Sequence, residues 1–584
     1  MERRVLLAIF LCFLSLYLWQ AVMVKPVPKP PVPATGAPAT GAPAAGVPAA
    51  PGSTAPATAA TKPAAIDSKL APLAEAPLVG DASEREIRVE TRDVIALFTN
   101  RGARLKSWRL KHYLDHQMQP QELVVNDLQS QPLPFTLRVP DDATNTVLSG
   151  GLYAVSGAPA DQPPATTPTH LRFEYSTAGN SLHVVKEFEI PADGYILSVK
   201  TTLTGAAGDD LPYAIHWGAA VGDIVENSRY AKKAEGLLFQ DKVRRLASKD
   251  FAAQPIHEGD FKYAGVDDNY FMTAALAPGP AKVTFQAIVI PPPPGSKEAE
   301  RDLVAYAIEP SRRDAPIRFF AGPKDFDVLA AIDRDVVRAI DFGMFSILVV
   351  PLLRSLKWVH GFVGNYGWSI IILTIMINAI MFPLRHKSVV SMRKMQEIQP
   401  EVKAIQERYS KLKATDPAKQ KMNTEMMALY RERGVNPASG CVPMLLTMPV
   451  LIAFYALLST AIELRGAPFF GWIHDLSVHD PLYIMPVLMG ITMVWQQKLA
   501  PAAGADPAQQ KMMMFMPVVF TGMFLWAPAG VAVYWFMSNL WAIGQQYLTN
   551  YLIGPPNIRN SRPPAERQMK RVGASKTEAA ARES

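Results

Sequence analysis

The side chains that offer chemistry in this chain are amides and hydroxyls placed inside strongly apolar segments. Asn378 is the clearest case, because it lies among isoleucines and methionines in SIIILTIMINAIMFPL. A polar group at membrane depth costs free energy unless it is hydrogen-bonded, so it marks a functional site or a contact between helices. Other apolar segments carry further groups of this kind: Thr447, Gln496, Gln497, Asn539, Gln545 and Gln546. Their chemistry is hydrogen bonding to water or to a polar segment of a partner.

The depth of these residues favours one of the two interpretations. Asn378 lies roughly 15 Å from the outer end of its segment and roughly 9 Å from the inner end, at 1.5 Å per residue. A single such residue is more often a hydrogen bond between helices. Several segments contribute here at a similar depth, which favours a hydrated pocket open to the cytoplasm. The outer halves of the segments are almost wholly apolar, and this argues against a conducting pore.

The composition indicates a membrane protein with a second, separate region. Of 584 residues, 49% are hydrophobic and 19% are charged, and the net charge is +7. The two cysteines, Cys12 and Cys441, exclude a disulfide framework. The sequence has no C-x-x-C motif or His/Cys cluster, so we expect neither a metal nor a cofactor.

The first third of the chain predicts an anchor, a tether and a β domain. An apolar run follows Arg3 and Arg4, so residues 1–24 are predicted to be a transmembrane anchor, with a cleaved signal peptide as the alternative. Residues 25–83 are rich in proline and alanine and predict an extended tether. Residues 84–325 alternate apolar and polar side chains between turns, which indicates a β-sandwich.

Residues 344–365 predict an amphipathic helix that lies in the membrane interface. One helical stripe is apolar: Leu352, Leu356, Val359 and Val363. The opposite stripe is polar or small: Arg354, Lys357, Gly361 and Gly364. A full membrane span is the alternative, but it would carry two charges at its centre.

The remaining apolar runs complete a mixed fold, a polytopic α-helical membrane bundle joined to the all-β domain. Together with the anchor they give six spans, of which the last five form the core: 366–384, 441–462, 481–499, 512–527 and 530–553. The span at 512–527 is short, so we expect the bilayer to thin there or the hairpin after it to lie low. The connections are a helical hairpin at 385–440, loops at 463–480 and 500–511, and a basic tail at 554–584.

Basic residues predict the orientation. They are frequent in 385–440 and in the tail, whereas 463–480 has only Arg465. The hairpin and both termini are therefore predicted to be cytoplasmic, and the β domain periplasmic. In the hairpin, we single out Arg385 and four methionines, whose flexible side chains suit partners of variable sequence: Met392, Met395, Met422 and Met426. The alternative is that these methionines are only core and the charges only a solvated face.

Several long motifs resemble one known family. They are NYGWSIIILT, PLRHKSVVSMRKMQEIQP, EMMALYRERGVNPASGCVPMLLTMPV, ELRGAPFFGWIHDLSVHDPLYIMPVLMG, DPAQQKMMMFMPVVF and FLWAPAGVAVYWFMSNLWAIGQQ. They closely resemble the YidC membrane-protein insertases of Gram-negative bacteria over about the last 240 residues. The resemblance implies an insertase and chaperone of the inner membrane, not an enzyme and without a cofactor, that acts alone or with the Sec translocon. It also implies a periplasmic β-supersandwich, similar to sugar-mutarotase folds, and a hairpin needed for activity.

The resemblance also implies a hydrophilic substrate groove and reveals a departure within it. Asn378 falls where the family usually has a positively charged residue, and Thr447 where close relatives have glutamine. Tyr534 and Trp535 match the aromatic pair of the last span, and Met448 lies beside the groove. The missing charge has one local substitute. Arg385 follows Asn378 by seven residues, on nearly the same helical face and roughly 10 Å closer to the cytoplasm, if the helix continues past Pro383.

The expected partners are nascent membrane proteins, the Sec translocon, membrane lipids and the ribosome, the last through the basic hairpin and tail. Two other functions were weighed. A secondary transporter would need charged or broken-helix sites near the midplane, and the sequence has neither. A membrane-tethered periplasmic carbohydrate-binding protein or enzyme would need paired carboxylates, and Glu187 and Glu189 are better explained as solvated strand residues.

Overall fold

The computed structural model describes residues 77–554 apart from 116, 125–130, 158–163, 178–180, 220–232, 291–300, 410–417, 436–441 and 500–506. The predicted anchor (1–24), most of the predicted tether and the basic tail beyond Gly554 lie outside the described residues. The last described part of the tether is attached to the β domain, because the backbone N–H groups of Leu78 and Asp81 donate to the carbonyls of Ser176 and Leu152. The prediction that the tether extends to residue 83 was therefore wrong by a few residues.

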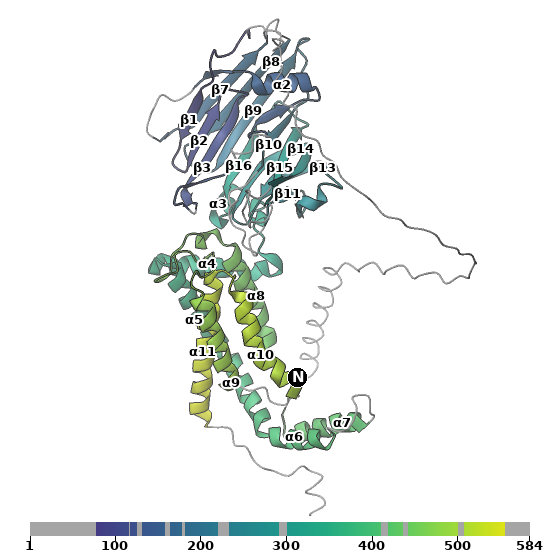
Figure 1. The fold of residues 1–584 in the computed structure, drawn as a ribbon, viewed down its shortest axis with the longest axis vertical. Helices are drawn as coiled ribbons and strands as arrows, with labels where there is room; N and C mark the ends of the chain where they lie inside the picture. Colours follow the sequence, from purple (N-terminus) through teal and green to yellow (C-terminus); the bar gives the residue numbers. More distant parts are fainter. Residues whose placement is uncertain are drawn as a thin grey trace, which may run out of the picture. The chain divides into compact units, whose positions relative to one another are not determined.

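The predicted β region folds into two antiparallel sheets (Figure 1). The smaller sheet has the order β1-β2-β3-β4: Glu86–Glu90, Val94–Thr99, Arg104–Leu114 and Pro120–Glu122. The strands of the larger sheet are β5 (Thr136–Arg138), β6 (Ala154–Ser156), β7 (Thr169–Ser176), β8 (Leu182–Ile190), β9 (Ile196–Gly205), β10 (Ala214–Trp217), β11 (Glu235–Phe239), β12 (Val243–Leu246), β13 (Ile256–Asp267), β14 (Phe271–Ile290), β15 (Arg301–Pro310) and β16 (Ile317–Pro323). Its main path runs β12-β11-β13-β14-β16-β9-β8-β7-β6, so neighbouring strands are often distant in sequence.

Period-two alternation built these strands as predicted. Leu197, Val199 and Leu203 of β9 are all buried, which confirms the inward face expected from their spacing. Large aromatic side chains fill the core, including Trp108 and Trp217, which are at most 2% exposed. The short helix α2 (Asp142–Gly150) begins at Asp141, whose carboxylate accepts from the backbone N–H of Thr144. The all-β character of this domain is confirmed.

One basic side chain lies on the inward face of β8. Lys186 alternates with Val184 and Phe188, and it is 1% exposed. Its Nζ donates to the carbonyl oxygens of Gly102 at 2.7 Å, Ala103 at 3.0 Å and Phe135 at 2.8 Å. An ammonium has three protons to donate, so all of its hydrogen-bonding capacity is used inside the β core.

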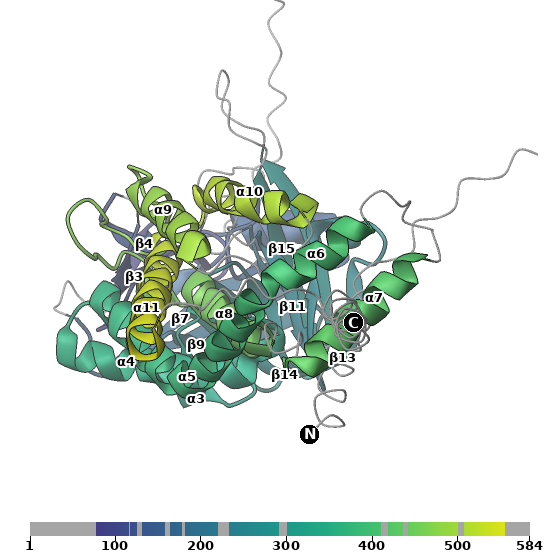
Figure 2. The same ribbon diagram turned by 90° about the horizontal axis from the view of Figure 1, so that it is seen from below.

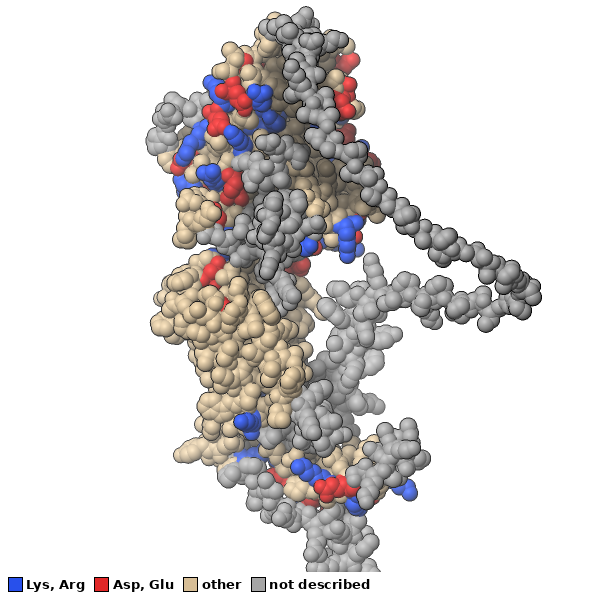
Figure 3. Space-filling model, viewed as in Figure 1, with Lys and Arg blue, Asp and Glu red and all other residues tan. Residues whose placement is uncertain are grey.

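The rest of the described chain is helical (Figures 1 and 2). Three 3₁₀ segments, Val336–Ala339, Gly343–Phe345 and Ile462–Leu464, accompany the helices, and a fourth, Ser248–Asp250, lies in the β domain. The helices are α3 (Phe326–Ile332), α4 (Ser346–Val363), α5 (Tyr366–Glu397), α6 (Gln399–Arg408), α7 (Ala418–Glu432), α8 (Val442–Thr460), α9 (Ile484–Leu499), α10 (Pro507–Phe524) and α11 (Ala529–Ile553). α11 packs against both α5 and α9, while α10 packs against α9. On the face shown in Figure 3, charged side chains are scarce over these packed helices and reappear on the hairpin α6–α7.

The apolar stripe of α4 differs from the predicted one. Its buried residues are Val349, Leu353, Leu356 and Val359, whereas Leu352 is half-buried and Val363 is exposed. The buried face is thus turned by one residue, because Lys357 must reach a set of carboxylates. Its Nζ lies 2.6 Å from Asp327, 3.0 Å from Glu463 and 3.6 Å from Asp325. Ion pairs of this kind link segments distant in sequence, and a helical wheel of α4 alone does not reveal them.

Two helices of the described chain are long and apolar enough to cross a membrane by length and composition, Gly343–Val363 and Tyr366–Glu397. Met448–Thr460 and Met514–Phe524 are shorter apolar helical stretches. The count of six spans therefore stays a prediction. α10 begins at Pro507, earlier than the predicted span at 512–527, so the helix is about 27 Å long although its apolar part is short.

α5 does not end where the predicted span meets the hairpin at residue 385. It continues for 32 residues through Pro383 to Glu397. α6 and α7 then fold back on each other over a small separate core: Met395, Ile398, Val402, Ile405, Leu429, Tyr430 and Val435, with Met422 and Met426 packed against it. Three of the four predicted methionines thus pack within the hairpin, and the side chain of Met392 lies outside the described part.

Candidate functional site: a polar pocket inside the helical bundle

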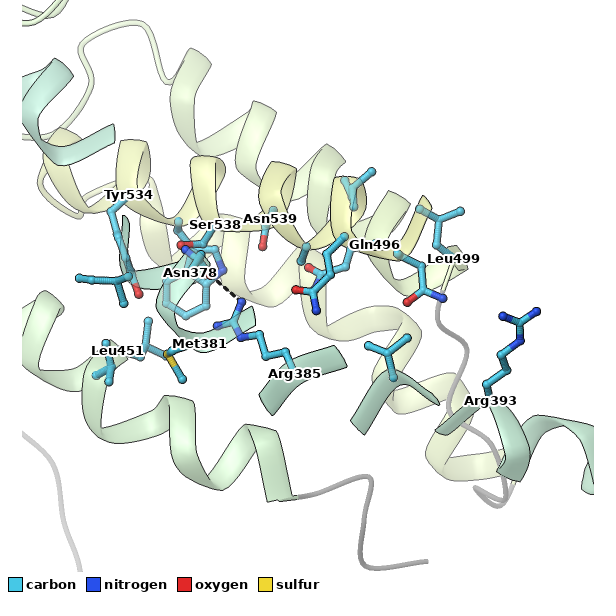
Figure 4. A pocket seen from close by; sticks show the side chains of 18 of the residues that line it. Asn378, Met381, Arg385, Arg393, Leu451, Gln496, Leu499, Tyr534, Ser538 and Asn539 are labelled. Carbon is cyan, nitrogen blue, oxygen red and sulfur yellow. Dashed lines mark hydrogen bonds between the residues drawn. The ribbon is translucent and has the colours of Figure 1, made fainter. Parts of the chain in front are cut away.

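A cavity of about 390 Å³ opens among α5, α8, α9 and α11 (Figure 4). It collects most of the polar residues singled out from the sequence. The lining residues are Ile377, Asn378, Met381, Arg385, Val389, Arg393, Gln396, Val450, Leu451, Gln496, Leu499, Tyr534, Trp535, Ser538, Asn539, Ala542, Ile543, Gln545 and Gln546. We call this cavity the polar pocket.

Asn378 is held at the wall of the polar pocket by two hydrogen bonds. It is 3% exposed, and its Nδ2 donates to the carbonyl of Thr374, one turn earlier, at 2.8 Å. Its Oδ1 accepts from Arg385 Nη1 at 2.5 Å, as the dashed line in Figure 4 shows. The amide is therefore satisfied through both of its functional ends, and a guanidinium stands at the position where a single amide looked unpaired.

The contact between Asn378 and Arg385 depends on the continuity of α5 through Pro383. Proline cannot donate a backbone hydrogen bond and usually kinks or ends a helix. Here the helix continues, so a step of seven residues, close to two full turns, brings the two side chains to one face. The guanidinium reaches back along the helix toward the amide, as expected for a long side chain with an apolar stem.

Asn539 has a structural role in the same region. Its Nδ2 donates to Thr492 Oγ1 at 3.1 Å and to the carbonyl of Met489 at 3.3 Å, so it joins α11 to α9. This is the hydrogen bond between helices that was the alternative for any single polar residue. The sequence analysis missed Thr492, because a hydroxyl that also donates to its own helix, here to the Met489 carbonyl, gives no distinct signal.

The aromatic pair of α11 fixes its neighbours on two sides. The ring of Tyr534 stacks on Phe454 of α8 with a centroid distance of 4.4 Å and an interplanar angle of 9°. Trp535 packs against Phe524 and Phe520 of α10, with centroid distances of 5.0 Å and 5.7 Å. The pair thus connects α8 and α10 through α11 at one end of the polar pocket.

Two predicted residues do not line the polar pocket. Gln497 is half-buried but faces elsewhere, because one residue along a helix turns the side chain by about 100° from Gln496. Met448 is 41% exposed and lies beside the lining residue Val450 without joining the lining itself. The side chain of Thr447 lies outside the described part of the chain.

The sequence analysis also missed lining residues of α5 below Arg385. Val389, Arg393 and Gln396 continue the same face in steps of three and four, so helical periodicity beyond Pro383 would have found them. Arg393 adds a second guanidinium to the lining. None of the described lining residues is an aspartate or a glutamate, so the polar pocket carries positive charge and hydrogen-bond donors.

The fold and the pocket together describe a helical membrane protein that carries a large all-β domain. Two family models match the chain in that order. One, described as the YidC periplasmic domain, matches residues 86–355, and the other, described as the 60Kd inner membrane protein, matches residues 358–554.

Curated relatives agree with these matches. The membrane protein insertase YidC of Geobacter sulfurreducens is 37% identical over 468 residues, 78% of this chain and 84% of that protein. That of Syntrophus aciditrophicus is 33% identical over 491 residues, 82% of this chain and 87% of that protein. A crystal structure of an active YidC insertase with its first transmembrane domain resolved matches at 19% identity and a TM-score of 0.34, covering 81% of this chain and 94% of that chain. The chain belongs to the YidC family of membrane protein insertases, which are not enzymes.

Proposed function

We propose that this protein inserts nascent membrane proteins into the bacterial inner membrane and that the polar pocket receives the polar segment of the substrate. The observation that carries the proposal is the buried pair of Asn378 and Arg385 inside a helical bundle whose outer surface is apolar. Moving a peptide group from water into hydrocarbon costs several kcal/mol for each group without a hydrogen bond. A pocket with donors and room for water lowers that cost at the start of the crossing.

The surface beside the pocket suits the apolar part of the same substrate. α10 exposes Phe515 at 62%, Val518 at 58% and Val519 at 52%. A substrate that places its polar segment in the polar pocket can leave its apolar segment against such surfaces and the lipid. The insertase then works by local hydration and by the shape of the bundle, without a nucleotide or another cofactor.

Arg385 supplies the charge that Asn378 lacks. Its guanidinium lies against the Asn378 amide, at the place where the family usually has a cation. We predict that Arg385→Ala lowers insertion of a YidC-dependent substrate into proteoliposomes by tenfold or more, since about 1.4 kcal/mol corresponds to a factor of ten. Lys387→Ala is the matched control, because Lys387 is an exposed residue of the same helix two positions on. Adding Asn378→Arg to Arg385→Ala should restore insertion.

The outcomes separate the role of the charge from the fold. Equal activity of the Arg385→Ala and Lys387→Ala proteins would contradict the role of Arg385. Insertion by empty liposomes at the rate of the wild-type protein would contradict the proposed function itself.

The remaining parts of the proposal follow from the sequence. We propose six spans with both termini in the cytoplasm and the β domain in the periplasm, which the distribution of basic residues supports. The protein acts alone or with the Sec translocon, and it assists folding as a chaperone. The hairpin α6–α7 and the basic tail contact the ribosome, because clustered lysine and arginine side chains beside a membrane attract RNA as well as anionic lipid.

A further inference from the structure

The end of the polar pocket nearest the hairpin holds a buried guanidinium with an unused donor. Arg393 is 6% exposed, and its Nη1 is buried without a hydrogen-bond partner. Figure 4 shows Arg393 beyond Leu499, at the end of the pocket remote from Asn378. An arginine keeps its charge at any pH that a protein tolerates, so it cannot escape the cost of burial by losing a proton. Such a group calls for an anion.

A second unused donor lines the same pocket on a different helix. Gln545 of α11 is 6% exposed, and its Nε2 is also buried without a partner. Buried donors are almost always paired in proteins, so two on one cavity indicate a ligand with acceptor atoms. The lack of carboxylates in the lining means that no lining residue supplies the negative charge.

The two donors lie at different depths. Thr549 Oγ1 approaches His386 Nδ1 at 3.5 Å, which sets the register between α11 and α5. Gln545 is one turn above Thr549, and Arg393 is about two turns below His386. Gln545 is therefore deeper in the bundle than Arg393. Apolar side chains lie around both, including Val389, Leu499 and Ile543.

This order of groups matches one phospholipid. A phosphate lies at the membrane surface, the ester carbonyls lie deeper, and an acyl chain lies deeper still. We propose that the hairpin end of the polar pocket binds a single anionic phospholipid, with its phosphate on Arg393 and an ester carbonyl accepting from Gln545. A guanidinium suits a phosphate because its planar fork can donate two parallel hydrogen bonds. Basic pockets between membrane helices on the cytoplasmic side bind anionic headgroups for the same reason.

The pocket favours an anionic headgroup over a zwitterionic one. Both guanidinium groups, those of Arg385 and Arg393, line the cavity, and none of the described lining residues offers a carboxylate to a choline or ethanolamine group. Arg385 is eight residues before Arg393, about 12 Å along the helix, so one phosphate does not reach both. The lipid site and the contact with Asn378 are thus separate, and the lipid site does not depend on the proposed substrate path.

The test uses the full chain in phosphatidylcholine nanodiscs that contain a small fraction of labelled phosphatidylglycerol. We expect Arg393→Gln to lower the affinity for phosphatidylglycerol by about tenfold, because a hydrogen bond to a charged group is lost. Gln545→Leu should lower it by about threefold, and Arg393→Lys, which keeps the charge and loses the fork, by an intermediate factor. Lys394→Gln is the matched control, since Lys394 is the exposed neighbour on the same helix, and it should change nothing.

Competition distinguishes the sources of the anion. The proposal requires that phosphatidylglycerol be displaced by other anionic phospholipids and not by inorganic phosphate, glycerol phosphate or a soluble acidic peptide. Displacement by the small anions would reduce the site to a general anion site, and displacement by the peptide would assign it to substrate; either result overturns the lipid site. Unchanged affinity in both Arg393→Gln and Gln545→Leu proteins overturns it as well. Insertion activity is measured separately and reports on the proposed function alone.

Discussion

The β domain and the polar pocket both bury basic side chains, but they treat them in opposite ways. Lys186 in the β core has three carbonyl acceptors within 3.0 Å, and Lys324 has the Asp267 carboxylate at 2.9 Å and the Asp268 carbonyl at 2.5 Å. Arg385 has the single amide oxygen of Asn378, and Arg393 leaves Nη1 without an acceptor. A buried cation with a full set of acceptors holds a structure together. One with too few is available to a ligand.

The comparison is informative because the same chain provides both cases. Unpaired buried donors cost free energy, so the fold could have removed them by apolar substitution, which is often neutral or stabilising. Their position in one cavity, next to apolar walls, indicates that the cost is recovered when something binds. The β domain shows that this chain can satisfy a buried cation fully where no ligand is involved.

The largest expected effect concerns Lys186. Lys186→Met leaves three buried carbonyl groups without a donor, so we expect the β domain to lose on the order of 4 kcal/mol of stability. Burial lowers the pKa of Lys186 well below its usual value, and the three carbonyls oppose that shift by binding the ammonium. The measurement is protease resistance of the β domain in the full chain against denaturant. Lys200→Met, on the exposed face of β9, is the control. Equal losses in the two variants would remove the contrast with the pocket.

A buried base of the β domain that is held neutral should reveal itself through pH. Burial, with a smaller effect of Arg138, lowers the pKa of His216 to about 4. The unfolded chain, with a pKa near 6.5, binds a proton that the folded domain does not, so stability is present above pH 6.5 and is lost as the pH falls toward 4. We expect this residue to contribute about 2 kcal/mol to that loss.

The control for the pH effect is His216→Gln, which removes the titration. The variant should show a flatter dependence of stability on pH between 6.5 and 4 than the wild-type protein. An identical dependence in both proteins would mean that His216 titrates in the folded domain as it does in water.

Much of this architecture follows from periodicity in the sequence, and its failures share one cause. Alternation placed Lys186 on the inward face with Val184 and Phe188, but it cannot say which carbonyls wait there. The α4 stripe was misplaced by one residue because Lys357 pairs with Asp327 and Glu463, which are brought near only by the fold. The helical step from Asn378 to Arg385 was predictable, whereas Arg393 was missed because the helix was divided at the end of the apolar run. Local pattern gives the face of each element, and distant partners decide the rest.

The smallest expected effect separates structural polar groups from binding ones within the pocket itself. Asn539 donates to Thr492 and to the Met489 carbonyl, so unlike Arg393 it already has its partners. Asn539→Leu leaves the Thr492 hydroxyl bonded to Met489 in its own helix at 2.7 Å, and no buried donor is orphaned. Hydrogen bonds between membrane helices contribute about 0.6 kcal/mol on average. We therefore expect a loss of that size in denaturant unfolding of the protein in detergent, with phosphatidylglycerol affinity unchanged. A loss of lipid affinity as large as that of Arg393→Gln would show that the pocket does not divide into structural and binding groups.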